Sequence, residues 1–237
     1  AVNGVPIAAV FELDRALRNK AGKQVLLDLK RGEETIQVIV TPTTAIADYR
    51  SRYRDWSYRN RLAVTEANSR IGYLHLAAMG ARDIASFARD FYANYDRDGL
   101  IIDVRRNRGG NIDSWIIEKL LRRAWSFWQS RDGSTWSNMQ QTFRGHLVVL
   151  TDERTYSDGE TFAAGIKALK LGTVMGRRTT GAGVWLTNRS RLVDRGIARV
   201  AEYPVFAMDG RWVNEGVGVE PDIEVVNYPH ATFMGED

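Results

Sequence analysis

Two segments of the sequence each pass from a short apolar run through a glycine-containing loop into an amphipathic helix, and this repeated plan limits the possible folds more than any other feature. The first segment has its apolar run at residues 99–104 and its loop at 107–111; the second has them at 146–151 and 157–160. Short apolar runs of this kind are typical of strands buried in a parallel sheet. The chain is therefore expected to form an α/β layer structure whose loops lie beyond the carboxyl ends of the strands.

The residues before this repeat follow a different pattern. Residues 8–17 are predicted to form a helix, and residues 24–30 and 35–40 two strands that flank a turn. About forty residues of this kind are too few to make a good core alone. We therefore divide the chain into a small domain at residues 1–45, a helical connector at 46–70 and an α/β core at 71–237.

The composition excludes several classes of site. The sequence has no cysteine and three histidines, which removes disulfides, thiolate nucleophiles and cysteine-based metal sites and leaves few histidines for a metal cage. No metal or organic cofactor is predicted. No apolar stretch approaches the roughly 20 residues needed to cross a bilayer, so no membrane partner is predicted either. The lack of cysteine is compatible with a reducing compartment.

Arginines alternate with aromatic residues between residues 49 and 61, a pattern that can bind phosphates and stack on bases. The net charge of +4 is low for a nucleic-acid-binding domain, and a charged helix with aromatic residues more often acts as a connector. We therefore predict no nucleic-acid partner. Binding that falls steeply with salt would support the alternative.

Ser157 has a structural and a functional interpretation. Ser157 and Glu160 match a capping box at the start of a helix, and on local sequence alone this interpretation is favoured. The functional interpretation is a serine nucleophile, with the N–H of Asp158 at the positive end of the helix stabilising an oxyanion. Thr155 stands where a nucleophile elbow has its first glycine, which argues against an α/β-hydrolase.

Gly109 and Gly110 also have two interpretations. Glycines serve a turn between strand and helix because they adopt positive φ. They also let a substrate carbonyl approach the backbone, which would make this loop a second source of oxyanion donors. The two loops follow adjacent strands in the predicted plan, so together they indicate an acyl-transfer site more strongly than either does alone.

Four motifs occur in the order found in tricorn-type serine peptidases, which are relatives of the C-terminal-processing peptidases. They are Asp103-Val-Arg-Arg-Asn-Arg-Gly-Gly110, Tyr156-Ser-Asp-Gly-Glu160, Gly176-Arg-Arg-Thr-Thr-Gly181 and Asn214-Glu-Gly-Val-Gly-Val-Glu-Pro-Asp-Ile-Glu224. The resemblance extends from about Tyr53 to Val226. It implies a crotonase-like peptidase core, and residues 1–45, which resemble the second half of a PDZ domain, lie where that family places one.

The resemblance implies a role for each matching residue. Ser157 would attack the scissile carbonyl, and the N–H groups of Gly110 and Asp158 would hold the oxyanion, with Gly109 at the substrate. Glu215 would be the acid of a Ser-His-Ser-Glu tetrad; without the motif order we would interpret it as a surface carboxylate in a glycine-rich turn. Residues 181–183 read Gly-Ala-Gly, without the lysine base of the C-terminal-processing branch.

The general base is the part of the resemblance that this chain does not match. In tricorn-type peptidases the histidine and its neighbouring serine lie upstream of the PDZ domain. His75 lies within a predicted strand, His146 begins the strand that leads to Ser157, and His230 lies near the C-terminus. None of the three is predicted to replace the base. We therefore expect a serine endopeptidase or oligopeptidase fragment that is inactive alone because the upstream histidine is missing.

For the whole protein, the resemblance implies N-terminal β-propellers, oligopeptide substrates, a cytoplasmic location and homo-oligomers. The alternative is a noncatalytic binding module with the same fold, as some relatives bind small hydrophobic ligands. The presence of Ser157, Gly109-Gly110 and Glu215 in one chain argues against it, because a binder does not need all three. Trp185 and Trp212 could line a substrate groove, but packing in the core is the favoured role for both.

Overall fold

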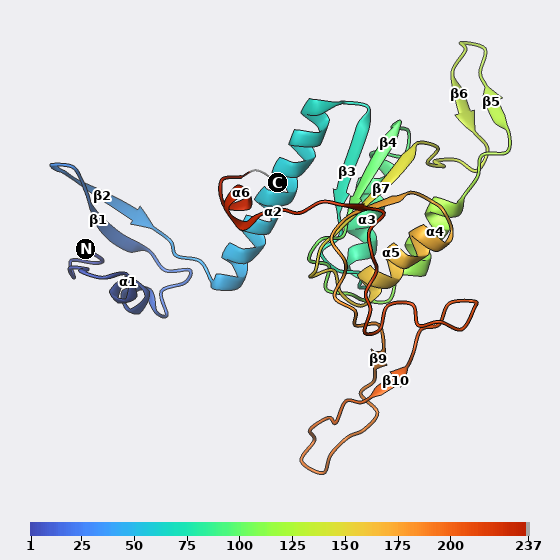
Figure 1. Cartoon of the computed structure of the whole chain (residues 1–237). Helices are drawn as coiled ribbons and strands as arrows, with labels where there is room; N and C mark the ends of the chain where they lie inside the picture. Colours follow the sequence, from blue (N-terminus) through green and yellow to red (C-terminus); the bar gives the residue numbers. More distant parts are fainter. Residues whose placement is uncertain (236–237) are drawn as a thin grey trace. The chain divides into compact units, whose positions relative to one another are not determined.

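A five-stranded sheet in the order β11-β8-β7-β4-β3 organises most of the chain in this computed structural model, which describes residues 1–235 (Figure 1). Each pairing along the sheet is parallel. The strands are β3 (Ile71–His75), β4 (Gly99–Asp103), β7 (His146–Thr151), β8 (Thr173–Gly176) and β11 (Ile223–Glu224). The α/β fold with a mainly parallel sheet that the sequence predicts is confirmed.

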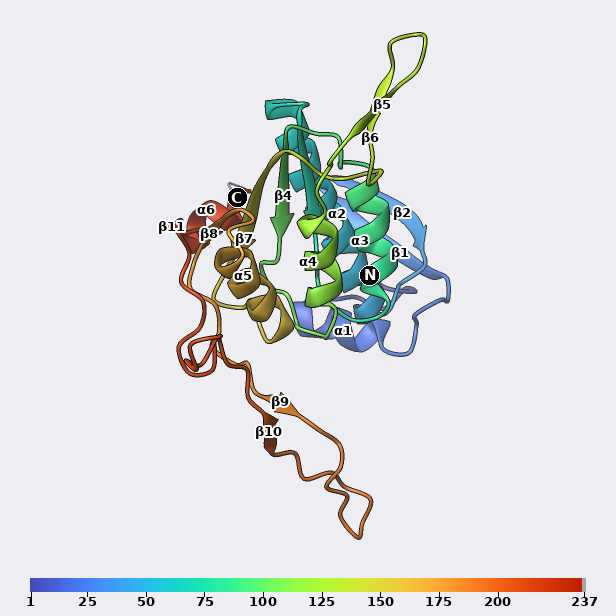
Figure 2. The same cartoon turned by 90° about the vertical axis from the view of Figure 1, so that its right-hand side faces the viewer.

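Three helices connect the strands and cover one face of the sheet (Figure 2). They are α3 (Asp83–Tyr92), α4 (Asp113–Leu121) and α5 (Asp158–Ala168). Strands β3, β4, β7 and β8 follow one another across the sheet in chain order, so right-handed crossovers place all three helices on the same side. The core between the layers includes Phe87, Ile102, Ile116, Val149 and Phe162, each almost fully buried.

The register of the central strands brings their carboxyl ends to a common edge. Asp103 at the end of β4 pairs with His75 at the end of β3 and with Leu150 near the end of β7. Thr151 pairs with Gly176 at the end of β8. The loops that carry the residues of interest therefore leave the sheet from this edge, as the sequence predicts.

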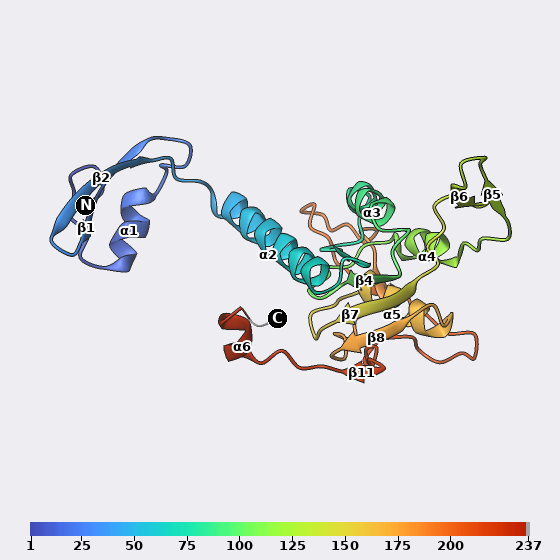
Figure 3. The ribbon, with the colours of Figure 1, turned by 90° about the horizontal axis from the view of Figure 1, so that it is seen from above.

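Contacts between residues divide the chain into two compact units, Ala1–Tyr58 and Arg59–Asp237. In the first unit, α1 (Val10–Leu17) lies beside an antiparallel hairpin of β1 (Val25–Arg31) and β2 (Glu34–Val40) (Figure 3). These elements are the helix and the two strands predicted from the sequence. The resemblance of residues 1–45 to part of a PDZ domain stays a prediction. Helix α2 (Ala45–Ala67) contains most of the predicted connector.

Two hairpins extend from the second unit (Figures 1 and 2). One consists of β5 (Phe127–Gln129) and β6 (Thr135–Ser137), the other of β9 (Trp185–Leu186) and β10 (Ala201–Tyr203); α6 (Pro229–Phe233) follows β11.

The prediction that Trp185 and Trp212 pack in the core is wrong, because they are 42% and 50% exposed. Both belong to the segment that includes the second hairpin, which adds no buried layer to the sheet. Among residues 1–235, no helix is both long and apolar enough to span a membrane.

Candidate active site

Ser157 is the residue immediately before α5, in a tight turn that follows β7. Its backbone has φ 56° and ψ −119°, a conformation that non-glycine residues rarely adopt and that costs of order 1–3 kcal/mol. Strain of this kind concentrates at active sites, and the nucleophile elbow of hydrolases is one example. The sequence lacks the glycine pattern of that elbow, yet Ser157 lies in a comparably strained turn.

The loop after β4 holds this turn in place through Asn107. The buried Asn107 accepts a hydrogen bond on its carbonyl from Tyr156 N–H at 3.0 Å, and its side-chain oxygen accepts one from Gly109 N–H at 2.8 Å. Its amide group donates to the carbonyl of Leu76 at 2.6 Å. Asn107 therefore connects the ends of β3, β4 and β7. No local sequence signal distinguishes Asn107 from other loop residues, because its partners lie far along the chain.

The two glycines of this loop face different neighbours. Gly109 has φ 76° and contacts Ser157: a Cβ added at Gly109 would lie 2.6 Å from Ser157 Cβ and 3.0 Å from Oγ. A Cβ added at Gly110 would lie 1.8 Å from the carbonyl oxygen of Met79, with which Gly110 forms a parallel bridge. Both positions therefore require glycine. Gly109 and Ser157 lie together, as expected for loops that follow adjacent parallel strands.

The predicted oxyanion donors have a feature in common. Gly110 N–H and Asp158 N–H donate no hydrogen bond to any group of residues 1–235. Asp158 is the first residue of α5, where the helix itself leaves the N–H free. Two unused backbone donors on the loops next to a strained serine are suited to stabilising negative charge on a bound oxygen.

The side chain of Asp158 binds the start of the neighbouring helix α4. Its Oδ2 accepts hydrogen bonds from Ile112 N–H at 2.8 Å and Asp113 N–H at 3.1 Å. Burial, followed by the nearby negative charge of Asp113, raises the pKa of the Asp158 carboxyl to about 7. This side chain thus connects the loop of Gly110 to the helix that follows Ser157.

Glu160 is a second buried carboxylate in the first turn of α5. Its Oε1 accepts hydrogen bonds from Ser157 N–H at 3.0 Å and Ala182 N–H at 2.9 Å. Its Oε2 accepts them from Gly181 N–H at 2.6 Å and the hydroxyl of Thr179 at 2.5 Å. The capping box that the sequence predicts is present. The connection to residues 179–182 is additional, and no local sequence signal indicates it.

Glu215 binds the residues that directly follow those bound by Glu160. Its Oε2 accepts hydrogen bonds from Gly183 N–H at 2.7 Å and Val184 N–H at 2.8 Å, and Gly216 N–H donates to the carbonyl of Gly181 at 2.8 Å. The loop at 181–184 therefore binds the carboxylate of Glu160 through its first two residues and that of Glu215 through its last two. The adjacent Asn214 is buried, and its side-chain amide has no hydrogen-bond partner among residues 1–235.

The three histidines lie at different places in the fold. His75 ends β3 at the carboxyl edge of the sheet, but it is buried, and its Nε2 lies 2.9 Å from the carbonyl oxygen of Arg105. Burial is the main reason that the pKa of His75 is lowered. His230 lies in α6.

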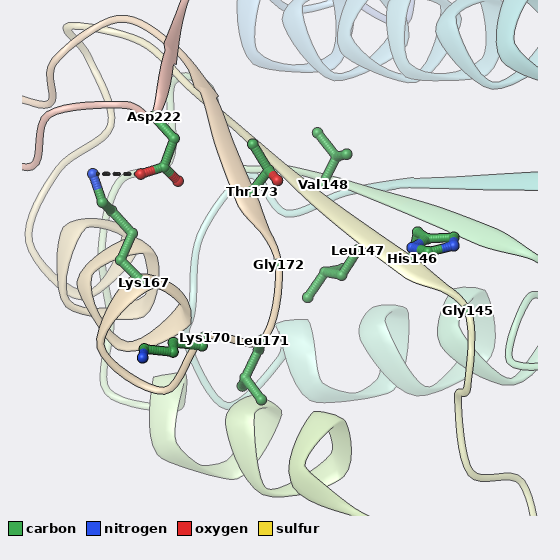
Figure 4. A pocket seen from close by; sticks show the side chains of 10 residues that line it. All are labelled: Gly145, His146, Leu147, Val148, Lys167, Lys170, Leu171, Gly172, Thr173 and Asp222. Atoms are coloured by element: carbon green, nitrogen blue, oxygen red, sulfur yellow. Dashed lines mark ion pairs between the residues drawn. The ribbon is translucent and has the colours of Figure 1, made fainter.

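His146 lies at the opposite edge of the sheet from Ser157, as its position at the start of β7 predicts. There it lines an open cavity of about 490 Å³ with Lys167, Lys170, Thr173 and Asp222 (Figure 4). Lys167 and Asp222 form an ion pair at 3.0 Å within it. This cavity includes none of the predicted site residues. Among residues 1–235, no three acidic or histidine side chains are grouped so that they could hold a metal ion.

Comparison with known proteins identifies relatives. Residues 70–225 match the family described as Peptidase family S41. The chain is 32% identical over 229 residues to the tricorn protease of Thermoplasma volcanium, covering 96% of this chain and 22% of that protein. It is 35% identical over 241 residues to tricorn protease homolog 1 of Streptomyces coelicolor, covering 100% of this chain and 22% of that protein.

A solved structure is similar as well. The crystal structure of the tricorn protease superposes with a TM-score of 0.84 at 32% identity, covering 100% of this chain and 23% of that one. This chain therefore spans about a fifth of the length of the relatives it matches.

Proposed function

Because this chain belongs to peptidase family S41, we propose that it supplies the nucleophile, the oxyanion donors and the acid of a serine peptidase of the tricorn type. The observation that carries this proposal is the strained backbone of Ser157 beside Gly109, between two loops with unused N–H donors. A structural cap does not need the strain of Ser157, and the start of a helix does not account for the unused N–H of Gly110. Both features suit a hydroxyl that attacks a carbonyl carbon.

In the proposed reaction, Ser157 Oγ bonds to the scissile carbonyl carbon while a base takes the hydroxyl proton. The carbonyl oxygen becomes an oxyanion, which accepts hydrogen bonds from Gly110 N–H and Asp158 N–H. The C–N bond then breaks, the leaving amine receives the proton from the base, and an acyl-enzyme remains on Ser157. Water, deprotonated by the same base, hydrolyses the acyl-enzyme and restores the hydroxyl.

Glu215 is proposed as the acid that orients the base through an intervening serine. Its Oε2 is held by two backbone N–H groups, which fixes the carboxylate and leaves Oε1 to accept a further hydrogen bond. The base itself is proposed to come from outside these 237 residues. His75 is buried against Arg105, and His146 lies at the opposite edge of the sheet.

The proposed substrates are peptides, with oligopeptides favoured by the similarity to tricorn proteases. A cytoplasmic location and assembly into homo-oligomers are part of the same proposal for the whole protein. They rest on the likeness to relatives of which this chain covers about a fifth.

Chemical rescue tests the proposal on this chain. The purified chain is treated with a fluorophosphonate probe, with and without imidazole, which substitutes for an absent histidine. We expect slow labelling without imidazole and labelling at least about tenfold faster with it, because general-base assistance contributes roughly 10²–10⁴-fold. Ser157→Ala should abolish the fast labelling. Ser190→Ala, which removes an exposed serine of the second hairpin, should retain it.

The other outcomes are equally informative. Fast labelling of Ser157 without imidazole would mean that a base lies within the chain, and the proposal of an external base would be wrong. No labelling under either condition would overturn the peptidase proposal. It would favour the noncatalytic binding module.

A further inference from the structure

We infer that Asp158 is a positioning residue. Its side chain holds the loop of Gly110 against α5 and thereby sets the distance between the two oxyanion donors. The inference rests on the proposed function and assigns a second role to this residue. The backbone N–H of Asp158 is one proposed donor. Its carboxyl group, in the same residue, fixes the loop that carries the other.

The hydrogen bonds of Asp158 place this role on specific atoms. Oδ2 receives the N–H groups of Ile112 and Asp113, at 2.8 and 3.1 Å. Only Asn111 lies between Gly110 and Ile112, so the loop has little free length between Gly110 and this attachment. Asp158 is 1% exposed, so both hydrogen bonds are shielded from competing water.

The other flank of the loop is held by Met79. Its N–H donates to the carbonyl of Gly109 at 2.9 Å, and its carbonyl accepts from Asn111 N–H at 2.8 Å. Gly110 therefore lies between two attachments, Met79 on one side and Asp158 on the other. Of these two attachments, the one to Asp158 involves the helix that follows Ser157, whereas Asn107 joins the same loop to the turn before that helix through Gly109 and Tyr156.

The surroundings of Asp158 contain further carboxyl groups. Asp113 faces it from α4, and Glu160 lies on its own helix, where four hydrogen-bond donors already engage it. Burial and Asp113 raise the pKa of Asp158 to about 7. Ionisation strengthens the carboxyl group as an acceptor. The amides of Ile112 and Asp113 should therefore report this titration directly.

Amide exchange measured by NMR tests the attachment without relying on catalysis. The probe is Asn111 N–H, which donates to Met79 and not to Asp158. Asp158→Ala should speed exchange at Asn111 by at least about tenfold, because losing the attachment frees the loop to open locally. Asp158→Asn keeps an oxygen acceptor and should stay within about threefold of the original chain. It should also abolish the shift of the Ile112 and Asp113 amide signals near pH 7.

Imidazole-assisted labelling of Ser157 supplies the second readout. Asp158→Ala should slow labelling by at least about tenfold, since displacing one oxyanion donor costs on the order of 10²–10³-fold in serine hydrolysis. Asp158→Asn should restore most of the rate. Ile117→Val is the control, because Ile117 lies in α4 and its side chain packs against Gly165 of α5.

The outcomes separate the two proposals. Unchanged exchange or unchanged labelling in a folded Asp158→Ala would overturn the positioning role and leave the peptidase proposal intact. Equal effects of Ile117→Val and Asp158→Ala at the same loss of stability would also overturn it, by showing only general loosening. Absence of labelling in the original chain would overturn the peptidase proposal, and exchange at Asn111 would still decide whether Asp158 holds the loop.

Discussion

The backbone N–H of Ser157 donates to the carboxylate of Glu160 at 3.0 Å, and this carboxylate simultaneously receives the N–H groups of Gly181 and Ala182. A single buried side chain therefore connects the turn of Ser157 to the loop that binds Glu215. The capping function and the tertiary connection share the same atoms. Changes at Glu160 should accordingly affect stability and the geometry of the site together.

Replacing Glu160 by glutamine should lower the free energy of unfolding by about 3 kcal/mol. Four donors surround the carboxylate, and an amide offers one oxygen to them while presenting an NH₂ group to the remaining donors. Urea denaturation measures the change. Glu220→Gln is the matched control, since Glu220 is an exposed carboxylate 3.6 Å from Arg178, and it should change stability little. Equal effects of the two substitutions would contradict the prediction.

Gly109→Ala should displace Ser157. The new Cβ would lie 2.6 Å from Ser157 Cβ, in addition to the strain of placing alanine at φ 76°. Gly133→Ala separates the two causes, because Gly133 has φ 88° and no atom within 4 Å of an added Cβ. Strain alone costs about 1–2 kcal/mol. Both variants should lose that much stability, but only Gly109→Ala should lose imidazole-assisted labelling of Ser157. Full labelling of Gly109→Ala would show that the contact does not fix the serine.

Glu215→Ala should release the loop at 181–184 and lower the free energy of unfolding by about 2 kcal/mol. Gly183 N–H and Val184 N–H both lose their acceptor in this variant. Amide exchange should become faster at these two positions, and Glu215→Gln, which keeps an oxygen, should show a smaller change. Glu118→Ala, at a carboxylate that is 67% exposed, provides the control. Unchanged exchange at Gly183 and Val184 would contradict the structure.

Stability should depend on pH through Asp158. Its folded pKa of about 7 lies above the ordinary value of 3.8, so between these limits the folded chain retains a proton that the unfolded chain has released. The contribution of Asp158 is therefore fully present below pH 3.8 and is lost as the pH rises to about 7. Asp158→Asn should remove this part of the decline when unfolding free energies are compared from acid to neutral pH. Parallel pH profiles of the two chains would contradict it.

The sequence predicts the elements whose causes are local. The apolar runs that became β4 and β7, and the periodic helices after them, bury their own side chains in one core. Gly109 and Ser157 are brought together because their loops follow adjacent parallel strands. That much follows from strand order and the common carboxyl edge of the sheet.

The remaining features depend on contacts between distant segments. Glu160 and Glu215 bind backbone N–H groups that are 21 to 32 residues away, and a backbone donor leaves no mark in the sequence. The strained φ of Ser157 is likewise supported by Asn107, through its bond to Tyr156. The exposed hairpins lack a buried face, so no periodic pattern of apolar residues predicts them. For this reason the prediction of Trp185 and Trp212 as core residues is wrong.

The segment between Val184 and Asn214 leaves and rejoins the fold at one point. At this point Glu215 binds Gly183 and Val184, and Gly216 binds Gly181, so hydrogen bonds close the base of the segment. The length of the hairpin is consequently independent of the position of the carboxylate. We therefore expect the hairpin to be exchangeable: a short turn or a longer insertion at residues 185–213 should alter the outer surface of the protein while Glu215 keeps its hydrogen bonds to Gly183 and Val184.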